Sequence, residues 1–399
     1  MSAAIITTLC VLLLIAYAFD LTASRTRIPS VILLLLLGWL VRQVSKFSGI
    51  EIPNLTPLLP ILGTIGLILI VLEGSLELEL DKSKAPLIKK SFFLALVPLM
   101  VLAFGLAYLF HYFTGANLKD SLTNAIPLCV ISSAIAIPSV KYLSSANKEF
   151  IIYESSLSDI LGVLLFNFFA LNAVISLSSF GSFVLQLIII IAISFVATVG
   201  LSFLIGRIEH SIKFAPIILL VILIYEISKI YHLPGLLFIL LFGLFLGNLD
   251  ELKGYKWIQR LRPEELNREA HKFKDIITET VFLIRSLFFL VFGYLIRTAE
   301  ILNLETLVWA AGITAGIFFI RYILLVITRL PVSPLLFVAP RGLITILLFF
   351  SIPLNQVIPI VNKSLIIQVI ILTALVMMFG LLSTRKPVKI TGTEQPLQP

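Results

Sequence analysis

The sequence predicts an all-α membrane protein of about 13 transmembrane helices, built as inverted repeats with two crossed, interrupted helices. Three observations support this fold class. Hydrophobic residues make up 59% of the 399 residues and charged residues 13%, whereas soluble domains carry about 25% charged residues. Apolar runs of membrane-spanning length, about 20 residues, recur along the whole chain. The fifth and the twelfth of these runs each contain prolines at widely separated positions.

The apolar runs define the predicted spans and the short polar gaps between them. The spans are expected at about residues 2–20, 27–46, 57–76, 86–112, 120–143, 149–176, 183–206, 214–231, 233–249, 279–298, 304–328, 332–354 and 364–383. Only His232-Leu233-Pro234-Gly235 separates the eighth run from the ninth, so one long kinked helix is the alternative there.

The loop charges predict the orientation of the spans. The loops on one side, together with the C-terminal tail, hold 21 lysines and arginines, and the loops on the other side hold 6. By the positive-inside rule, the N-terminus is expected outside and the C-terminus in the cytoplasm. The longest polar segment, residues 250–274, is expected to be a cytoplasmic loop with an interfacial amphipathic helix around residues 264–273.

The remaining composition excludes several classes of function. The net charge is +8, but the basic residues lie in short gaps without interleaved aromatic residues, which argues against nucleic-acid binding. Cys10 and Cys129 both lie within apolar runs and predict neither a disulfide framework nor a metal site. The tail, residues 385–399, shows no pattern. We therefore expect a single transmembrane domain over residues 1–384, with no enzymatic activity and no cofactor.

The fifth and twelfth runs share an unusual feature, because prolines interrupt both. The fifth run carries Pro127 and Pro138, and the twelfth carries Pro334, Pro340, Gly342 and Pro353. Proline removes a backbone donor and leaves carbonyl groups free to coordinate a ligand. Interrupted spans in matching positions of two halves indicate a transport site near the middle of the membrane.

The first candidate for that site is Asp159 in the sixth run, because a carboxylate inside a membrane span is costly and usually functional. It can bind a proton or a small alkali cation, and the two compete. Ser158 is adjacent, and Ser155 lies on the same helical face. Ser132 and Ser133 are expected to supply further oxygen ligands from the break in the fifth span. The alternative is an aspartate that only forms hydrogen bonds between helices.

Four more charged residues within or near spans have candidate roles. Glu154 lies about 140° around the helix from Asp159 and is expected to form a structural ion pair with Arg321, with direct participation in transport as the alternative. Arg341 is placed to offset the negative end of a half-helix, or to reach the cytoplasmic surface. Arg285 is expected either to lie in the middle of the tenth span and hold a carboxylate or the crossover in place, or to lie at the membrane interface.

These residues resemble the monovalent cation:proton antiporters, which include the sodium/proton exchangers. Glu154-Ser155-Ser156-Leu157-Ser158-Asp159 is similar to the family signature Glu-Ser-x-x-Asn-Asp, with Ser158 in place of asparagine. Residues 66–78 resemble the third-span pattern, Arg321 the eleventh-span arginine, and Pro340-Arg341-Gly342 the twelfth-span motif. Within this family the sequence resembles the NhaP-like exchangers, and the resemblance covers all thirteen predicted spans. However, residues 132–136, Ser-Ser-Ala-Ile-Ala, resemble the Kef-type potassium-efflux branch, so the choice between Na⁺ and K⁺ stays open.

The resemblance implies a homodimer whose protomers each contain a core of spans 4–6 and 11–13, about residues 86–176 and 304–383, and a dimerisation scaffold of the other spans. It also implies exchange of Na⁺ or K⁺ for H⁺ at Asp159 by an elevator-like movement of the core. The physiological role that it implies is pH homeostasis. Because one binding carboxylate is expected, we predict 1:1 electroneutral exchange. An organic-anion:sodium symporter and a non-transporting membrane scaffold are the alternative classes. We expect a multi-pass protein of a prokaryotic inner membrane.

Overall fold

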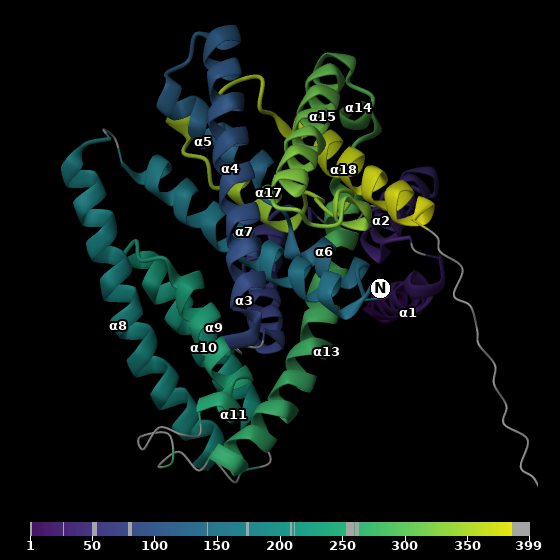
Figure 1. Ribbon diagram of the computed structural model, residues 1–399. Helices are drawn as coiled ribbons and strands as arrows, with labels where there is room; N and C mark the ends of the chain where they lie inside the picture. The colour runs from purple at the N-terminus through teal and green to yellow at the C-terminus, as the bar shows by residue number, and fades with distance from the viewer. Residues whose placement is uncertain are drawn as a thin grey trace, which may run out of the picture.

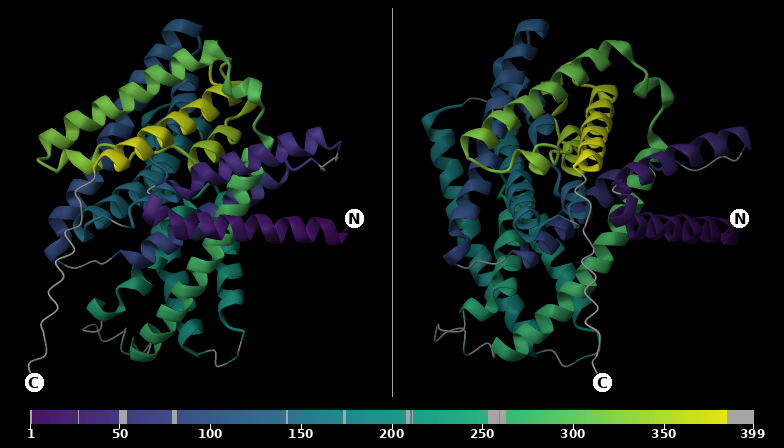
Figure 2. Two further views of the ribbon diagram at one scale, coloured as in Figure 1. Left: turned by 90° about the vertical axis from the view of Figure 1, so that its right-hand side faces the viewer. Right: turned by 45° about the vertical axis from the view of Figure 1, so that its right-hand side comes forward.

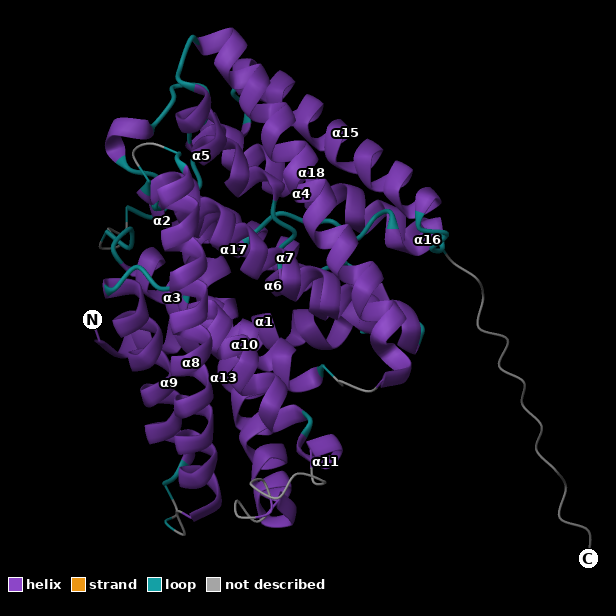
Figure 3. Ribbon diagram, turned by 60° about the vertical axis from the view of Figure 1, so that its left-hand side comes forward, coloured by secondary structure: helices purple, strands orange, loops and turns teal. Residues whose placement is uncertain are grey.

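The computed structural model describes residues 2–26, 28–49, 54–78, 82–141, 143–172, 175–207, 210, 212–252, 259 and 263–384, and all the regular secondary structure in these residues is helical. Figures 1 and 3 show the arrangement, with no strand in these residues. The helices are α1 (Ser2–Thr26), α2 (Ser30–Phe47), α3 (Leu58–Glu77), α4 (Ala85–Thr114), α5 (Leu118–Cys129), α6 (Ser133–Ser139), α7 (Ser145–Leu171), α8 (Leu177–Arg207), α9 (Phe214–Ile230), α10 (Gly235–Gly247), α11 (Leu249–Leu252), α13 (Pro263–Leu295), α14 (Thr298–Ile301), α15 (Leu304–Ile327), α16 (Val332–Leu335), α17 (Leu343–Phe350) and α18 (Lys363–Ser383).

Each predicted span overlaps a helix or a pair of half-helices. Within the described residues, nine helices are long and apolar enough to cross a membrane, and two shorter apolar helices lie within α1 and at α10. The all-helical membrane fold is therefore confirmed, and the total of thirteen crossings stays a prediction. The eighth and ninth spans are separate helices, because the chain turns between α9 and α10 at His232, which has a φ of 56°.

The segment predicted as a loop between the ninth and tenth spans differs from the expectation. The described residues at its two ends are helical: α11 covers Leu249–Leu252, and residues 264–273 form the first turns of the long helix α13. Neither glycine nor proline occurs between Pro263 and Gly293. The helix therefore continues from the polar segment into the apolar span instead of starting again at the membrane surface.

The helices form two groups that meet at α3, α6, α7 and α17 (Figures 1 and 2). In the first group α4 packs against α5 and α7, and α15 packs against α4 and α18. In the second group α13 packs against α2 and α3, and α10 packs against α3 and α8. The left view of Figure 2 shows α1 and α2 lying across α13. Helix α3 of the second group contacts α6, α7 and α17, so it lines the boundary between the groups.

Glycine allows the closest contact in the second group, between α2 and α13. A Cβ atom on Gly38 would lie 2.3 Å from the carbonyl oxygen of Leu290, and one on Gly293 would lie 2.4 Å from that of Leu35. Side chains at these positions would push the two helices apart. Small residues at such crossings let membrane helices approach to van der Waals contact of their backbones, which fixes α13 against α2.

Both proline-containing spans are interrupted, and their breaks touch. The fifth span ends as α5 at Cys129, runs extended through Val130 and Ser132, and resumes as α6. The first half of the twelfth span is the short helix α16, and the chain then runs irregularly to Gly342, the residue before α17. The backbone N–H of Ser132 donates to the carbonyl oxygen of Pro340 over 2.9 Å. This hydrogen bond marks the crossing of the two breaks.

Candidate functional site

Asp159 lies in α7 beside the break in the fifth span and is buried. Its Oδ2 atom accepts a hydrogen bond from the backbone N–H of Ser133 over 3.3 Å and another from the Ser133 hydroxyl. Its Oδ1 atom is also buried and has no hydrogen-bond partner among the described residues. Burying a polar atom without a partner is costly, so Oδ1 is the atom that a bound proton or cation would satisfy.

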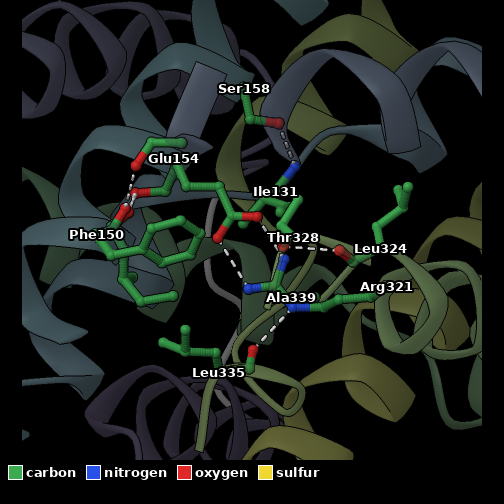
Figure 4. Close-up of polar contacts among 12 residues, drawn as sticks. Ile131, Phe150, Glu154, Ser158, Arg321, Leu324, Thr328, Leu335 and Ala339 are labelled. Atoms are coloured by element: carbon green, nitrogen blue, oxygen red, sulfur yellow. Dashed lines mark hydrogen bonds and ion pairs between the residues drawn. The ribbon is translucent and has the colours of Figure 1, made fainter. Parts of the chain in front are cut away.

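Of the four serines predicted as ligands, only Ser133 forms a hydrogen bond with Asp159, and the other three have different contacts. Ser158 accepts a hydrogen bond of 3.0 Å from the N–H of Ile131, so it holds the extended break in place (Figure 4). Ser155 donates to the carbonyl oxygen of Ile151 on its own helix over 2.7 Å. The hydroxyl of Ser132 is buried and has no partner among the described residues. Ser133 is thus the predicted ligand that the structure brings into direct contact with Asp159.

Arg341 lies at the break in the twelfth span and is buried instead of reaching the surface. Its Nε atom donates to the carbonyl oxygen of Leu128 over 3.0 Å, and its Nη2 atom donates to that of Cys129 over 3.1 Å. These carbonyls end the half-helix α5, where the partial negative charge of the helix dipole is concentrated. The guanidinium therefore caps α5 from the other interrupted span, and its charge is offset by backbone oxygens.

Glu154 and Arg321 form a two-pronged ion pair between α7 and α15. Nη1 and Nη2 of Arg321 lie 2.6 and 2.8 Å from the two carboxylate oxygens of Glu154. Nε of Arg321 donates to the carbonyl oxygen of Leu335 over 2.8 Å. Figure 4 shows the guanidinium between the carboxylate and this carbonyl. Because both partners are buried and each oxygen of Glu154 is bonded, the charge of this carboxylate is neutralised by Arg321.

Arg285 lies away from the crossing of the two breaks. It is buried in α13, and its Nη2 atom lies 3.6 Å from Oδ1 of Asp20 in α1. The hydroxyl of Ser30, the first residue of α2, lies 3.4 Å from the same carboxylate oxygen. The carboxylate that Arg285 holds is therefore Asp20.

The structure adds polar residues that the sequence analysis did not single out. Thr373 in α18 accepts the backbone N–H of Arg341 through its hydroxyl, which ties the twelfth-span break to α18. Thr345 in α17 and Ser156 in α7 have buried hydroxyls without a partner among the described residues. In the sequence these residues are small polar positions inside apolar runs. Only the folded contacts show that they lie beside the breaks or the boundary between the helix groups.

The site is closed in this conformation. Ser158, Arg321 and Arg341 line a cavity with a volume of about 10 Å³, which is about the smallest space that can hold one water molecule. Asp159 itself is 1% exposed. Exchange with either side of the membrane therefore requires the helices around Asp159 to move.

Taken together, the fold and the site define a polytopic membrane protein in which two crossed, interrupted helices surround one buried carboxylate with a free oxygen atom. The sequence model described as "Sodium/hydrogen exchanger, transmembrane" matches residues 10–384. The chain belongs to this family of cation/proton antiporters. The family consists of transporters and not of enzymes. This membership favours antiport over organic-anion symport and over a non-transporting scaffold.

Two solved structures share the fold. One is described as the structure of the sodium proton antiporter MjNhaP1 from Methanocaldococcus jannaschii at pH 8. It is 17% identical, with a TM-score of 0.70, and the match covers 95% of this chain and 100% of that one. The other is an electron-microscopy map of the same antiporter, 18% identical, with a TM-score of 0.66 and coverage of 97% and 100%. No curated protein sequence matches the chain.

Proposed function

We propose that the protein exchanges one Na⁺ or K⁺ for one H⁺ at Asp159, without net movement of charge. The observation that carries this proposal is the unpartnered Oδ1 atom of a buried carboxylate at the crossing of two broken helices. A proton or an alkali cation neutralises the same carboxylate, so the two ions exclude each other. If the loaded site faces one side of the membrane at a time, this competition alone produces exchange.

The charges around the site favour the 1:1 stoichiometry. Both oxygens of Glu154 are bonded to Arg321, and the charge of Arg341 is offset by carbonyl oxygens. Asp159 is then the titratable group of the site that binds a proton in one half of the cycle and a cation in the other. The site carries the same charge whether it returns with a proton or with a monovalent cation, so the membrane potential does not drive either half of the cycle.

The two groups of helices support an elevator-like cycle. The group that contains α4–α7 and α15–α18 forms the moving core, and α1–α3 with α8–α13 form the scaffold through which two protomers dimerise. The core carries Asp159 past α3, which lines the boundary. In this proposal the protein lies in a prokaryotic inner membrane with its N-terminus outside and its C-terminus in the cytoplasm.

The test uses purified protein in liposomes with an imposed pH gradient, with the internal pH followed by a fluorescent dye. Adding the transported cation is expected to dissipate the gradient, and comparing Na⁺, K⁺ and Li⁺ identifies that cation. The initial rate is expected to stay the same when an ionophore for an ion that is not transported imposes different membrane potentials. A rate that depends strongly on voltage contradicts the 1:1 stoichiometry, and a gradient that no cation dissipates contradicts exchange.

A further inference from the structure

An ion pair between Lys141 and Asp20 crosses the boundary between the two helix groups, away from Asp159. Nζ of Lys141, just after α6, lies 3.4 Å from Oδ2 of Asp20 in α1. Figure 1 shows the end of α6 beside α1, and Asp20 lies in the C-terminal part of that helix. Lys141 belongs to the same interrupted span as Ser133, so any displacement of the core carries Lys141 with it.

Asp20, in contrast, is fixed to the scaffold. Nη2 of Arg285 in α13 lies 3.6 Å from its Oδ1 atom, and the hydroxyl of Ser30 lies 3.4 Å from the same atom. The carboxylate therefore has one oxygen turned to the scaffold and the other to the core. If the core moves against α1 and α13, the contacts of Oδ1 can persist, whereas the contact with Lys141 has to break.

A second set of polar contacts between the groups, made by Lys363, can persist when the core moves. Nζ of Lys363, at the start of α18, lies 3.1 Å from the carbonyl oxygen of Leu295 and 3.2 Å from Oε1 of Glu300. Leu295 and Glu300 lie at the connection that leads from α13 to α15. That connection is continuous with the core and can follow it. Lys141 and Asp20, in contrast, lie in segments that are more than a hundred residues apart. No short connection therefore lets Asp20 move together with the core.

We propose that the ion pair of Lys141 and Asp20 is a latch that stabilises the closed conformation seen here and opens each time the core moves. This proposal rests on the elevator-like cycle of the proposed function. On the predicted orientation, the latch lies on the cytoplasmic half of the boundary, since α6 and α1 both end toward that side. Releasing it shifts the conformational equilibrium toward the state in which the core is displaced.

The expected size of the shift follows from the exposure of the pair. The side chain of Lys141 is 57% exposed and that of Asp20 is 23% exposed. Partly exposed ion pairs contribute little, so loss of this one is expected to raise the population of the displaced state by about two- to fivefold. A contact of this strength holds the resting state without preventing the cycle.

A cysteine at position 156 reports the displacement directly. Ser156 is 1% exposed, and its hydroxyl lies 3.0 Å from the position that a Cβ atom on Gly74 of α3 would take. It is therefore enclosed at the boundary of the groups. In a background with Cys10→Ser and Cys129→Ser, the Ser156→Cys thiol is expected to react slowly with N-ethylmaleimide, and to react faster when the core moves away from α3.

The experiment measures this reaction rate for the full chain in liposomes. Lys141→Gln and Asp20→Asn are each expected to raise the rate by about two- to fivefold, and the double variant is expected to add nothing to the Asp20→Asn effect. Lys141→Arg keeps the ion pair and should react as slowly as the parent. Lys148→Gln is the matched control, because it removes the same charge nearby, at the start of α7, without breaking an ion pair among the described residues.

The outcomes separate this proposal from the proposed function. Equal rates for Lys141→Gln and Lys148→Gln overturn the latch, as do effects of Lys141→Gln and Asp20→Asn that add fully in the double variant. If the rates change as expected while no cation dissipates a pH gradient, the latch stands and cation exchange fails. If exchange is found but the latch variants behave as the control does, exchange stands and the latch fails.

Discussion

Replacing Asp159 with asparagine is expected to reduce cation-driven proton movement to the level of liposomes without protein. Asparagine has nearly the same shape, and its carbonyl oxygen can accept both hydrogen bonds that Ser133 donates in the structure. The fold is therefore expected to survive. The variant side chain, however, can neither release a proton nor neutralise a cation, so the competition that drives exchange is lost.

The measurement is the dissipation of an imposed pH gradient in liposomes by the cation that the wild-type protein transports. Asp120→Asn is a suitable control, since Asp120 lies in the first turn of α5 and is half-buried outside the site. It is expected to transport at the wild-type rate. An Asp159→Asn variant that still dissipates the gradient would show that another group carries the proton.

Breaking the ion pair of Glu154 and Arg321 is expected to have the largest effect on stability. Glu154→Gln leaves the guanidinium of Arg321 buried without its counter-charge, and an unpaired buried charge of this kind costs about 3–5 kcal/mol of unfolding free energy. Arg321→Gln is expected to cost a similar amount, because the Glu154 carboxylate is then the uncompensated charge. Both residues are almost fully buried, so solvent cannot relieve the loss.

The measurement is denaturant unfolding of purified protein in detergent, followed by tryptophan fluorescence. The matched control is the double variant Glu154→Leu/Arg321→Met, which removes both charges and keeps most of the side-chain volume. It is expected to recover much of the lost stability, because well-packed apolar residues often replace a buried ion pair without cost. Single variants that unfold like the wild-type protein would show that the pair is solvated or absent in the membrane.

Apolar runs were sufficient to predict the helices of this chain, because a membrane leaves the backbone few alternatives to helix. The paired prolines also indicated the two interrupted spans, whereas the single Pro98 leaves α4 continuous. The fifth span opens at residues 130–132, beside the Ser132-Ser133 pair where the break was expected. The contact made there was not predicted: the N–H of Ser132 donates to the carbonyl oxygen of Pro340. That partner is about two hundred residues away in the chain, so only the fold can show it.

The site shows the same division between local and distant information. Asp159 and Ser133 were predicted as neighbours, because a buried carboxylate and a broken helix both need polar partners. The capping of α5 by Arg341 was one of two alternatives, and only the contacts with Leu128 and Cys129 select it. The pair of Asp20 and Lys141 was not predicted, since each residue alone is an ordinary charge at the end of a span.

The most direct test is whether a proton and the alkali cation compete for the carboxylate of Asp159. Cation binding to the purified protein is measured by isothermal titration calorimetry in buffers with different ionisation enthalpies, which gives the number of protons released on binding. Below the pH at which the site loses its proton, we expect about one proton for each cation bound, and neither binding nor release in Asp159→Asn. Cation binding without proton release, or release that persists in Asp159→Asn, would contradict competition at Asp159.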